Sequence, residues 1–476
     1  MKKKRINNIN WKRIYVLYIA AIIVFSVLAI VSNRDMLTGP RVAVQFATTA
    51  MLMLSLGLYT YVTDREVLER TRNTMAMFTT MIVSYLVIQL YSVWDYAIYL
   101  VPFSMCALIL SLIVSGKSGF FANFVVITLC FMESINWQTN ASLASEYIFY
   151  LLFGGIVEAV YVSFVLGKHY RRIRYLSVGL MVGFISAICA SISYLMFQEV
   201  EALQWNEYFI RIGCAFASGT IGVMLMFMLV PLFEKIFNVV SVFRFAEIAS
   251  SDNSLMRKLY EKAPGTYNHS LTVATYVEAC AMAIGESAIM ARAAAYYHDI
   301  GKMKNPSYFT ENQFSGVNPH DSMTPEASVS MIKSHVTQGL LIAKDYRLPH
   351  EVQSAIAEHQ GSMPIKYFYL KAQKYTDGKL PYDGYCYDGP KPKGKISAIL
   401  MICDASEAAL RAIGTRENAE KIVNDIIMER LMFDQFSECD ITMKEIDIIK
   451  STIITTFSGI KHKRVKYPNV DLVGDK

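Results

Sequence analysis

The adjacent pair His298-Asp299 is the clearest chemical signal in this sequence. It stands in the stretch Ala-Tyr-Tyr-His-Asp-Ile-Gly-Lys at 295–302. An imidazole beside a carboxylate suits a site that binds divalent metal ions and activates water for hydrolysis. Six of the eight histidines also fall within residues 269–359, namely His269, His298, His320, His335, His350 and His359. This concentration predicts a hydrolytic metal site in the second half of the chain.

A site for phosphate esters needs several imidazoles and carboxylates that meet in space. Although they are far apart in sequence, facing helices of a bundle can assemble metal sites from such side chains. Asp299 is the best candidate to bridge two ions, because its two oxygens can serve separate metals. Lys302, one turn further on, is expected to neutralise a phosphate oxygen during catalysis. The candidate ligands are His269, His298, Asp299, His335, His359 and Asp404.

The segment that carries these residues is predicted to be all-α. From 267 to about 457 it alternates helix-forming runs with short polar breaks and shows almost no period-two strand pattern. Gly285 and Gly301 are interpreted as C-caps of the first two helices. Two loops lie between later helices, at 305–325 and 376–395, and the first is interpreted as a lid. The expected helices are 270–284, 287–300, 325–345, 351–358 and 396–413.

The first half of the chain is much more apolar. The whole sequence is 53% hydrophobic and 18% charged, and nearly all of the apolar excess lies before residue 236. Repeated apolar runs of about 20 residues indicate helices that cross a bilayer about 30 Å thick. The turn that splits 75–114 into two spans is marked only by Asp95 and its neighbours. The eight expected spans are 15–31, 42–62, 75–94, 97–114, 120–135, 147–166, 178–196 and 209–232.

The orientation of these spans follows from the basic residues, because cytoplasmic loops carry the excess of Lys and Arg. Basic clusters stand at 2–5, 64–72 and 168–174, whereas 198–207 holds three glutamates and no Lys or Arg. Eight spans place both termini in the cytoplasm, and no small-residue cleavage site follows the first span. We therefore expect a multi-pass protein of the cell membrane, with the lipid bilayer as a partner.

Two charged residues fall inside the expected spans, Glu158 and Arg211. Charged groups in a bilayer usually mark a function or a buried pair, and an arginine near a helix end can also reach the interface. We interpret both residues as structural. The sequence shows no paired short or broken helices of the kind that transporters use.

The remaining composition narrows the function. The eight cysteines form no CxxC pair, which is typical of reduced thiols and neither of a disulfide framework nor of a zinc ribbon. The net charge of +6 is largely explained by the inside loops and tails, so we expect no nucleic-acid polymer as a partner. A homodimer is compatible with this chain, but no residue specifies it.

These motifs resemble the HD superfamily of metal-dependent phosphohydrolases. The closer resemblance is to the membrane-embedded HD-domain phosphodiesterases that hydrolyse cyclic di-AMP. It is carried by Ala-Pro-Gly-Thr-Tyr-Asn-His-Ser at 263–270, Asn-Pro-His-Asp at 318–321, Ser-His-Val-Thr at 334–337 and Gly-Pro-Lys-Pro at 389–392, together with the stretch at 296–302. The resemblance runs from about 230 to 468. The fold class expected is all-α: a polytopic membrane domain of about eight spans at 1–233, a helical connector at 234–262, and a cytoplasmic HD phosphohydrolase domain at 263–476.

The resemblance implies hydrolysis of cyclic di-AMP to pApA at two divalent transition-metal ions, manganese or iron. Asp299 would be shared between the ions and would be catalytic together with Lys302. Substrate contacts are expected from His320, Lys391 and Lys393. One ion would be held by His269, His298, Asp299 and Asp404, and the other by Asp299, His335 and His359.

Two features depart from the family pattern. The family usually has a second histidine after the one at 359, whereas this chain reads Glu-His-Gln-Gly at 358–361. Gln360 offers a carbonyl oxygen, which is a weaker ligand for a transition metal than an imidazole, so the second ion is expected to bind less tightly. Relatives also carry a large domain between the first two membrane helices, where this chain has only a short loop at 32–41.

Two other functions fit the same residues. The chain could be an HD phosphohydrolase that acts on another nucleotide, such as cyclic di-GMP or an alarmone. It could instead be a nucleotide-binding membrane receptor that no longer cleaves, because Gln360 impairs the second metal site. For the phosphodiesterase, the connector would carry a signal from the membrane domain, and the sequence does not identify that signal.

Overall fold

The computed structural model describes residues 9–32, 38–90, 96–134, 141–166, 172–198, 204–313, 316–375, 380–415 and 417–460. These residues form helices joined by turns and loops, with no β-strand in the described part beyond one isolated bridge between Pro364 and Cys386. The all-α fold class is thereby confirmed. The chain divides into two compact units, Met1–Phe243 and Arg244–Lys476. The division falls inside the expected connector at 234–262.

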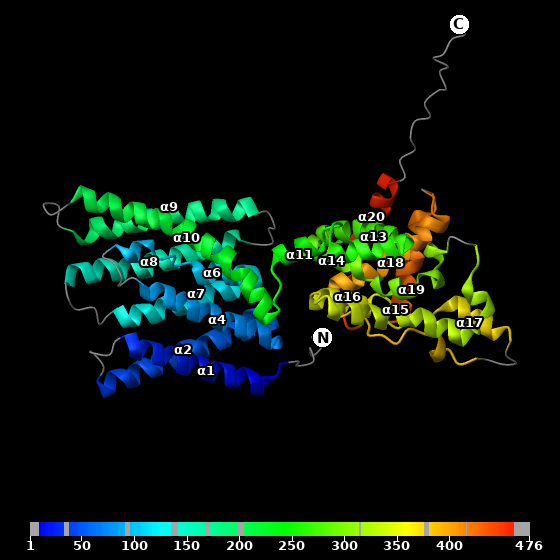
Figure 1. The fold of residues 1–476 in the computed structure, drawn as a ribbon, viewed down its shortest axis with the longest axis horizontal. Helices are drawn as coiled ribbons and strands as arrows, with labels where there is room; N and C mark the ends of the chain where they lie inside the picture. The colour runs from blue at the N-terminus through cyan, green and yellow to red at the C-terminus, as the bar shows by residue number, and fades with distance from the viewer. Residues whose placement is uncertain are drawn as a thin grey trace, which may run out of the picture. The chain divides into compact units, whose positions relative to one another are not determined.

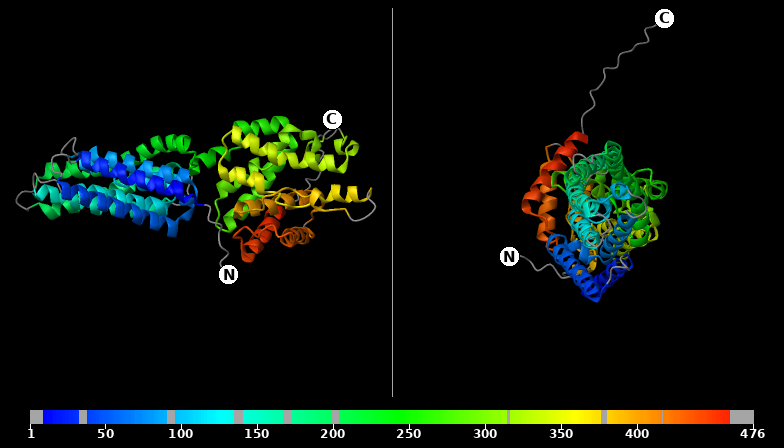
Figure 2. Two further views of the ribbon diagram at one scale, coloured as in Figure 1. Left: turned by 90° about the horizontal axis from the view of Figure 1, so that it is seen from below. Right: turned by 90° about the vertical axis from the view of Figure 1, so that its left-hand side faces the viewer.

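The first unit is a bundle of apolar helices that lie alongside one another (Figures 1 and 2). Among the described residues, five helices are long and apolar enough to cross a membrane: α1, α2, α8, α9 and α10. The count of eight spans stays a prediction, and the basic residues at 2–5, Lys168 and Arg171 lie outside the described residues. The helices are α1 (Trp11–Ser32), α2 (Gly39–Thr63), α3 (Arg65–Glu69), α4 (Thr71–Ile88), α5 (Ala97–Leu100), α6 (Met105–Ile113), α7 (Gly116–Ser134), α8 (Ala141–Val165), α9 (Arg172–Phe197) and α10 (Trp205–Phe237).

The fourth apolar run is broken rather than continuous. Helix α5 ends at Leu100 and α6 begins at Met105, because Pro102 lacks an N–H and disfavours the helical conformation of the residue before it. The carboxylate of Glu158 from α8 lies at this break, where its Oε2 accepts a hydrogen bond from the backbone N–H of Ser104 at 3.2 Å. The expectation of one uninterrupted helix over 97–114 is therefore wrong, and Glu158 helps to satisfy the break.

Arg211 lies in a buried ion pair and does not extend to the surface of the unit. Its guanidinium contacts the carboxylate of Glu146 and lies 3.0 Å from Glu207 Oε2. The guanidinium carbon also lies 4.6 Å from the ring centre of Tyr194. Arg211 is 4% exposed and Glu146 is fully buried. This arrangement supports the structural interpretation of Arg211, since a buried charge must be paired.

Small residues let α9 and α10 pack closely. A Cβ on Gly183 would lie 2.1 Å from the carbonyl oxygen of Phe216, and a Cβ on Gly219 would lie 2.2 Å from that of Gly179. Such contacts are typical of membrane helices, where close backbone approach replaces the hydrophobic effect as the source of association. The pair is seen side by side in Figure 1.

The second unit is built from shorter helices. The connector is two short helices, α11 and α12, rather than one rod, and the buried faces of these helices include Phe245, Ile248, Leu255 and Leu259. The helices are α11 (Val242–Ile248), α12 (Ser254–Lys262), α13 (Pro264–Ala283), α14 (Ala288–Tyr297), α15 (Pro325–Asp345), α16 (His350–Glu358), α17 (Lys366–Gln373), α18 (Lys395–Ile413), α19 (Ala419–Met432) and α20 (Met443–Ile460).

The two glycine caps differ. Gly285 has φ +80°, as expected for a left-handed residue after a helix. Helix α14, however, ends at Tyr297 and not at 300, and Gly301 does not have a positive φ. Gly301 is needed for packing instead, because a Cβ there would lie 1.9 Å from the carbonyl oxygen of His335 in α15. The close approach brings His298-Asp299 next to α15.

The expected lid, of which residues 305–313 and 316–325 are described, contains short 3-10 turns at Pro306–Tyr308, Thr310–Asn312 and Pro319–Ser322. It is tied to the start of α13, where the side-chain oxygen of Asn312 accepts hydrogen bonds from the backbone N–H groups of Gly265 (2.9 Å) and Thr266 (3.2 Å). These N–H groups have no partner within the helix, so Asn312 caps α13 from a distant segment.

Candidate metal centre

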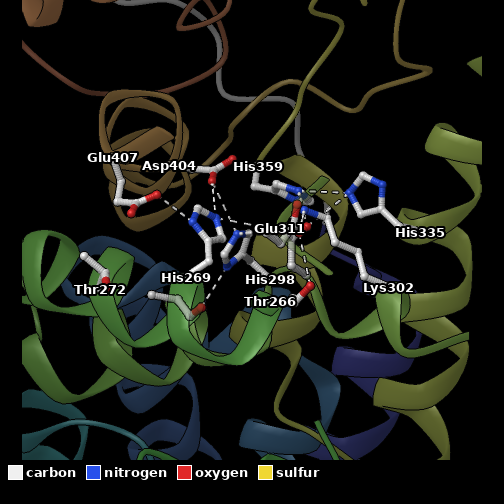
Figure 3. A network of polar contacts seen from close by, with 12 residues as sticks. Thr266, His269, Thr272, His298, Lys302, Glu311, His335, His359, Asp404 and Glu407 are labelled. Atoms are coloured by element: carbon white, nitrogen blue, oxygen red, sulfur yellow. Dashed lines mark hydrogen bonds and ion pairs between the residues drawn. The ribbon is translucent and has the colours of Figure 1, made fainter. Parts of the chain in front are cut away.

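Five helices bring the predicted ligands to one place. Figure 3 shows four imidazoles pointing toward one another, with Asp404 and Lys302 beside them. His269 lies on α13, His335 on α15 and Asp404 on α18, whereas His298 and His359 are the C-cap residues of α14 and α16. All six predicted ligand residues are thus brought together, and they are far apart only along the chain.

The first group of ligands consists of His269, His298, Asp299 and Asp404, with ligand atoms within 4.8 Å of one another. Nε2 of His269 lies 2.9 Å from Asp404 Oδ1, and Nε2 of His298 lies 3.2 Å from Asp299 Oδ2. Asp404 approaches the imidazoles from α18 and Asp299 from the turn after α14, which leaves the four donors facing a common point.

The second group consists of Asp299, His335 and His359. Asp299 Oδ1 lies 3.4 Å from His335 Nε2 and 3.6 Å from His359 Nε2, and the two imidazole nitrogens are 3.3 Å apart. Asp299 therefore turns Oδ2 toward the first group and Oδ1 toward the second. This is the geometry that a bridging carboxylate requires.

Hydrogen bonds at the far side of each ring orient the four imidazoles. Nδ1 donates to the carbonyl oxygen three residues earlier at 2.7 Å in His298, 2.6 Å in His335 and 2.9 Å in His359. In His269 the partner of Nδ1 is Glu407 Oε2, at 2.7 Å. With Nδ1 protonated, the lone pair of each Nε2 faces the centre, as is usual for metal-binding histidines.

The buried atoms at the centre fit a divalent cation. His298 Nε2 and Asp299 Oδ1 have no hydrogen-bond partner among the described residues, although both side chains are almost fully buried. Leaving such groups unsatisfied costs about 1–3 kcal/mol each, and more for a charged group. A cation between the lone pairs removes this cost, and nitrogen with carboxylate oxygen is a donor set that divalent metals bind.

The two groups differ in charge. Burial lowers the pKa of His269 and of His298, but neighbouring carboxylates outweigh this effect. Asp404 and Glu407 raise the pKa of His269 to about 9. Asp299 and Asp404 raise the pKa of His298 to about 10. In His335 burial prevails and lowers the pKa to about 4. The carboxylates around the first group thus favour positive charge on its imidazoles, whereas burial disfavours it at His335.

Lys302 lies at the edge of the centre and is paired with two carboxylates. Its Nζ is 2.6 Å from Asp299 Oδ2 and 2.9 Å from Glu311 Oε1. Burial acts to lower the pKa of Lys302, but these carboxylates hold it above its ordinary value, so the ammonium stays charged. Glu311 also accepts a hydrogen bond from Thr266 Oγ1 at 3.1 Å.

The side-chain amide of Gln360 is hydrogen-bonded to a carboxylate of the first group. Its Nε2 donates to Asp404 Oδ2 at 3.2 Å, while Asp404 Oδ1 faces His269. The side chain therefore orients a first-group carboxylate. The second group has three protein donors, one of which is shared.

The predicted substrate residues lie outside the two ligand groups. His320 is 4% exposed, and its Nε2 donates to the carbonyl oxygen of Tyr308 at 3.0 Å, so it packs inside the loop. Nζ of Lys391 is 3.0 Å from Asp434 Oδ2. Lys393 is exposed, and its backbone N–H donates to Glu358 Oε2 at 3.1 Å.

Two acidic residues of the centre were not anticipated from the sequence. Glu407 follows Asp404 by three residues on α18, so a helical pattern of two acids on one face was present and could have indicated it. Glu311 has no such local signal, because it reaches Lys302 only through the folding of the loop over α13.

The fold and the centre define a helical protein with a metal-binding unit of the HD class and an apolar helical unit. Two family models match the chain: a 7TM receptor with intracellular HD hydrolase over residues 40–241, and the HD domain over 266–409. These two matches confirm the resemblance seen in the motifs.

Curated relatives carry a specific name. The cyclic-di-AMP phosphodiesterase PgpH of Bacillus subtilis is 36% identical over 372 residues, which cover 78% of this chain and 51% of the relative. The protein of the same name from Listeria monocytogenes is 37% identical over 373 residues, covering 78% and 50%. This chain spans about half the length of these relatives.

The chain is also similar to two solved structures of the L. monocytogenes PgpH HD domain, of which the second is in complex with cyclic-di-AMP. Each is 43% identical to the matched part, covers 44% of this chain, and gives a TM-score of 0.43. The alignments include 100% and 99% of those two chains, respectively.

Proposed function

We propose that this protein is a metal-dependent phosphodiesterase that hydrolyses cyclic di-AMP to pApA. The observation that carries the proposal is the carboxylate of Asp299, whose two oxygens face two different groups of metal ligands. The names of the curated relatives support the choice of substrate.

The ligand groups would hold two divalent ions, manganese or iron, for which imidazole and carboxylate donors are suitable. When bound, such ions supply a Lewis acid and lower the pKa of water for attack on a phosphodiester. Asp299 and the four Nε2 atoms would fix the ions, and burial would strengthen every charge interaction there. Because the second group has fewer donors, its ion would bind less tightly.

Lys302 would act on the substrate. Its ammonium is already held beside Asp299, so it is positioned to exchange a carboxylate partner for a phosphate oxygen. This exchange would neutralise charge that develops in the transition state. Lys391, Lys393 and His320 remain proposed substrate contacts, and His320 would also support its loop through the hydrogen bond to Tyr308.

The apolar unit would place the enzyme in the cell membrane as a multi-pass protein with both termini in the cytoplasm. Five described helices and the family model support membrane residence. The membrane domain would regulate the hydrolase through α11 and α12, and a homodimer would be compatible with such control.

The proposal is tested with the full chain in lipid nanodiscs. Wild type with Mn²⁺ should convert cyclic di-AMP to pApA, with chelation and Asp299→Ala each removing the activity. Cyclic di-GMP and an alarmone, offered under the same conditions, test the nearest alternative substrates. Faster turnover of either alternative would contradict the assignment.

A non-cleaving receptor is the second candidate, and the contact between Gln360 and Asp404 favours it. If the second group fails to retain an ion, nucleotide would bind without being cleaved. Metal content separates the two functions: two ions per chain with Mn²⁺-dependent turnover support the enzyme, and one or none with retained nucleotide binding supports the receptor.

A further inference from the structure

A pocket of about 510 Å³ lies beside the first ligand group. Its walls come from the start of α13, from the 3-10 turn Thr310–Asn312 and from the last turns of α18. None of the six ligand residues lines it. The lining residues are Pro264, Gly265, Asn268, Thr310, Glu311 and Arg411.

Three of these residues connect the pocket to the centre. Asn268 immediately precedes the ligand residue His269 on α13. Glu311 holds the ammonium of Lys302, which in turn contacts Asp299. The pocket is therefore adjacent to the ligand groups through two separate segments of the chain.

Arg411 makes the third connection along one face of α18. It follows Asp404 by seven residues and Glu407 by four, a spacing that places all three on the same side of a helix. Seven residues correspond to about 10 Å along the axis. Glu407 lies between Arg411 and the centre, because its Oε1 is 3.6 Å from Arg411 Nε and its Oε2 is 2.7 Å from Nδ1 of the ligand residue His269.

The charges around the pocket leave Arg411 available to an anion. Its side chain is 52% exposed, and its Nε lies 3.6 Å from Glu407 Oε1. The other oxygen of Glu407 is bonded to His269, and Glu311 is bonded to Lys302 and Thr266. Both carboxylates near the pocket thus already have cationic or hydrogen-bonding partners. The terminal nitrogens of Arg411 have no partner among the described residues.

We infer that this pocket receives the second phosphate of a cyclic dinucleotide, the one that is not cleaved, with Arg411 as its binding partner. The inference rests on the proposed function. A cyclic dinucleotide carries its two phosphodiesters on opposite sides of one ring, so binding one at the ligand groups must place the other a short distance away. The planar guanidinium can bind two phosphate oxygens at once, and the exposed amide of Asn268 offers another donor.

Arg411 would then select substrates with two phosphates. It acts away from the scissile bond, so its contribution should be the same in the bound substrate and in the transition state. Loss of such an interaction raises KM and leaves kcat nearly unchanged. Hydrogen bonds to a charged group predict an increase in KM of about tenfold or more.

The test compares two substrates with the full chain in nanodiscs and Mn²⁺. Cyclic di-AMP has two phosphates, whereas bis(p-nitrophenyl) phosphate is a diester with one. Arg411→Ala should raise KM for cyclic di-AMP about tenfold or more, with a much smaller change for the single diester, and Arg411→Lys should recover part of the loss. Arg257→Ala, which removes an exposed arginine that does not line the pocket, is the matched control.

Two results would overturn the inference. An unchanged KM for cyclic di-AMP in Arg411→Ala would mean that the guanidinium does not bind this substrate. Equal losses with both substrates, together with reduced metal content, would mean that Arg411 acts through Glu407 and His269. Failure of the wild type to hydrolyse cyclic di-AMP is a different result, because it removes the proposed function itself and the inference with it.

Discussion

Gln360 donates its side-chain amide to Asp404 Oδ2 at 3.2 Å, which ties the residue after a second-group histidine to a first-group carboxylate. The contact leaves Asp404 Oδ1 directed at His269 Nε2. The chain thus combines a four-donor group and a three-donor group that share Asp299. This asymmetry is the basis of the first prediction.

Gln360→His should preserve or raise hydrolysis of cyclic di-AMP. An imidazole is a better ligand for a transition metal than an amide oxygen, so the second ion should be retained more tightly. Metal content per chain and turnover at limiting Mn²⁺ measure the effect, with Gln360→Ala as the comparison that only removes the contact with Asp404. A large loss of activity in the histidine variant would show that orienting Asp404 is the more important role.

Asp299→Ala should abolish hydrolysis while the protein remains inserted in the membrane. The substitution removes the only residue that belongs to both ligand groups of the described chain, and both should then lose affinity for metal. Turnover and metal content are measured on protein extracted from the membrane fraction. Substantial remaining turnover would be incompatible with a shared carboxylate at the catalytic centre.

Glu407→Gln should weaken metal binding about 10- to 100-fold, the usual effect of losing a partner that orients a ligand histidine. The carboxylate accepts from His269 Nδ1 at 2.7 Å, and a neutral amide would orient and polarise this ring less strongly. Competition with a metal-binding dye measures the affinity. Glu420→Gln, at an exposed position on α19, is the control, and equal affinities in the two variants would exclude a positioning role for Glu407.

Gly301→Ala should destabilise the second unit by about 1–3 kcal/mol or more, the cost of forcing an extra group into a packed interior. The new Cβ would lie 1.9 Å from the carbonyl oxygen of His335 and 2.5 Å from the backbone nitrogen of Gly339. Melting of the full chain in detergent should shift downward by roughly 2–4 °C for each kcal/mol. Gly384→Ala serves as the control, because a Cβ there meets nothing within 4 Å. Equal melting temperatures of the two variants would refute the packing argument.

Arg211→Leu should destabilise the membrane unit by about 3–5 kcal/mol, because it leaves the buried carboxylate of Glu146 without its cationic partner. Thermal unfolding in detergent measures the change. Adding Glu146→Gln to this variant should recover much of the loss, since no buried charge is then left unpaired and Glu207 is partly exposed to solvent. If Arg211→Leu alone melted at the same temperature as the wild type, the ion pair would contribute nothing to stability.

Local chemistry and periodicity determined part of this protein from the sequence alone. The imidazoles and carboxylates at 269, 298, 299, 335, 359 and 404 could be chosen by residue type, and the structure brings all six together. Helix α15 has the bounds expected, Pro325–Asp345, because Thr324 caps it and Pro325 begins it. Apolar run length likewise indicated the membrane unit, since a bilayer demands about 20 apolar residues per helix.

Contacts between distant segments were decided only by the tertiary structure. Which carboxylate Gln360 would meet, that Glu311 would hold Lys302, and that Gly301 would press against His335 all depend on how helix faces meet. At the break between α5 and α6, Glu158 from another helix accepts the hydrogen bond of the Ser104 backbone N–H. A sequence specifies the donors and acceptors, but the pairing of those groups is a property of packing, in which segments far apart in the chain compete for the same space.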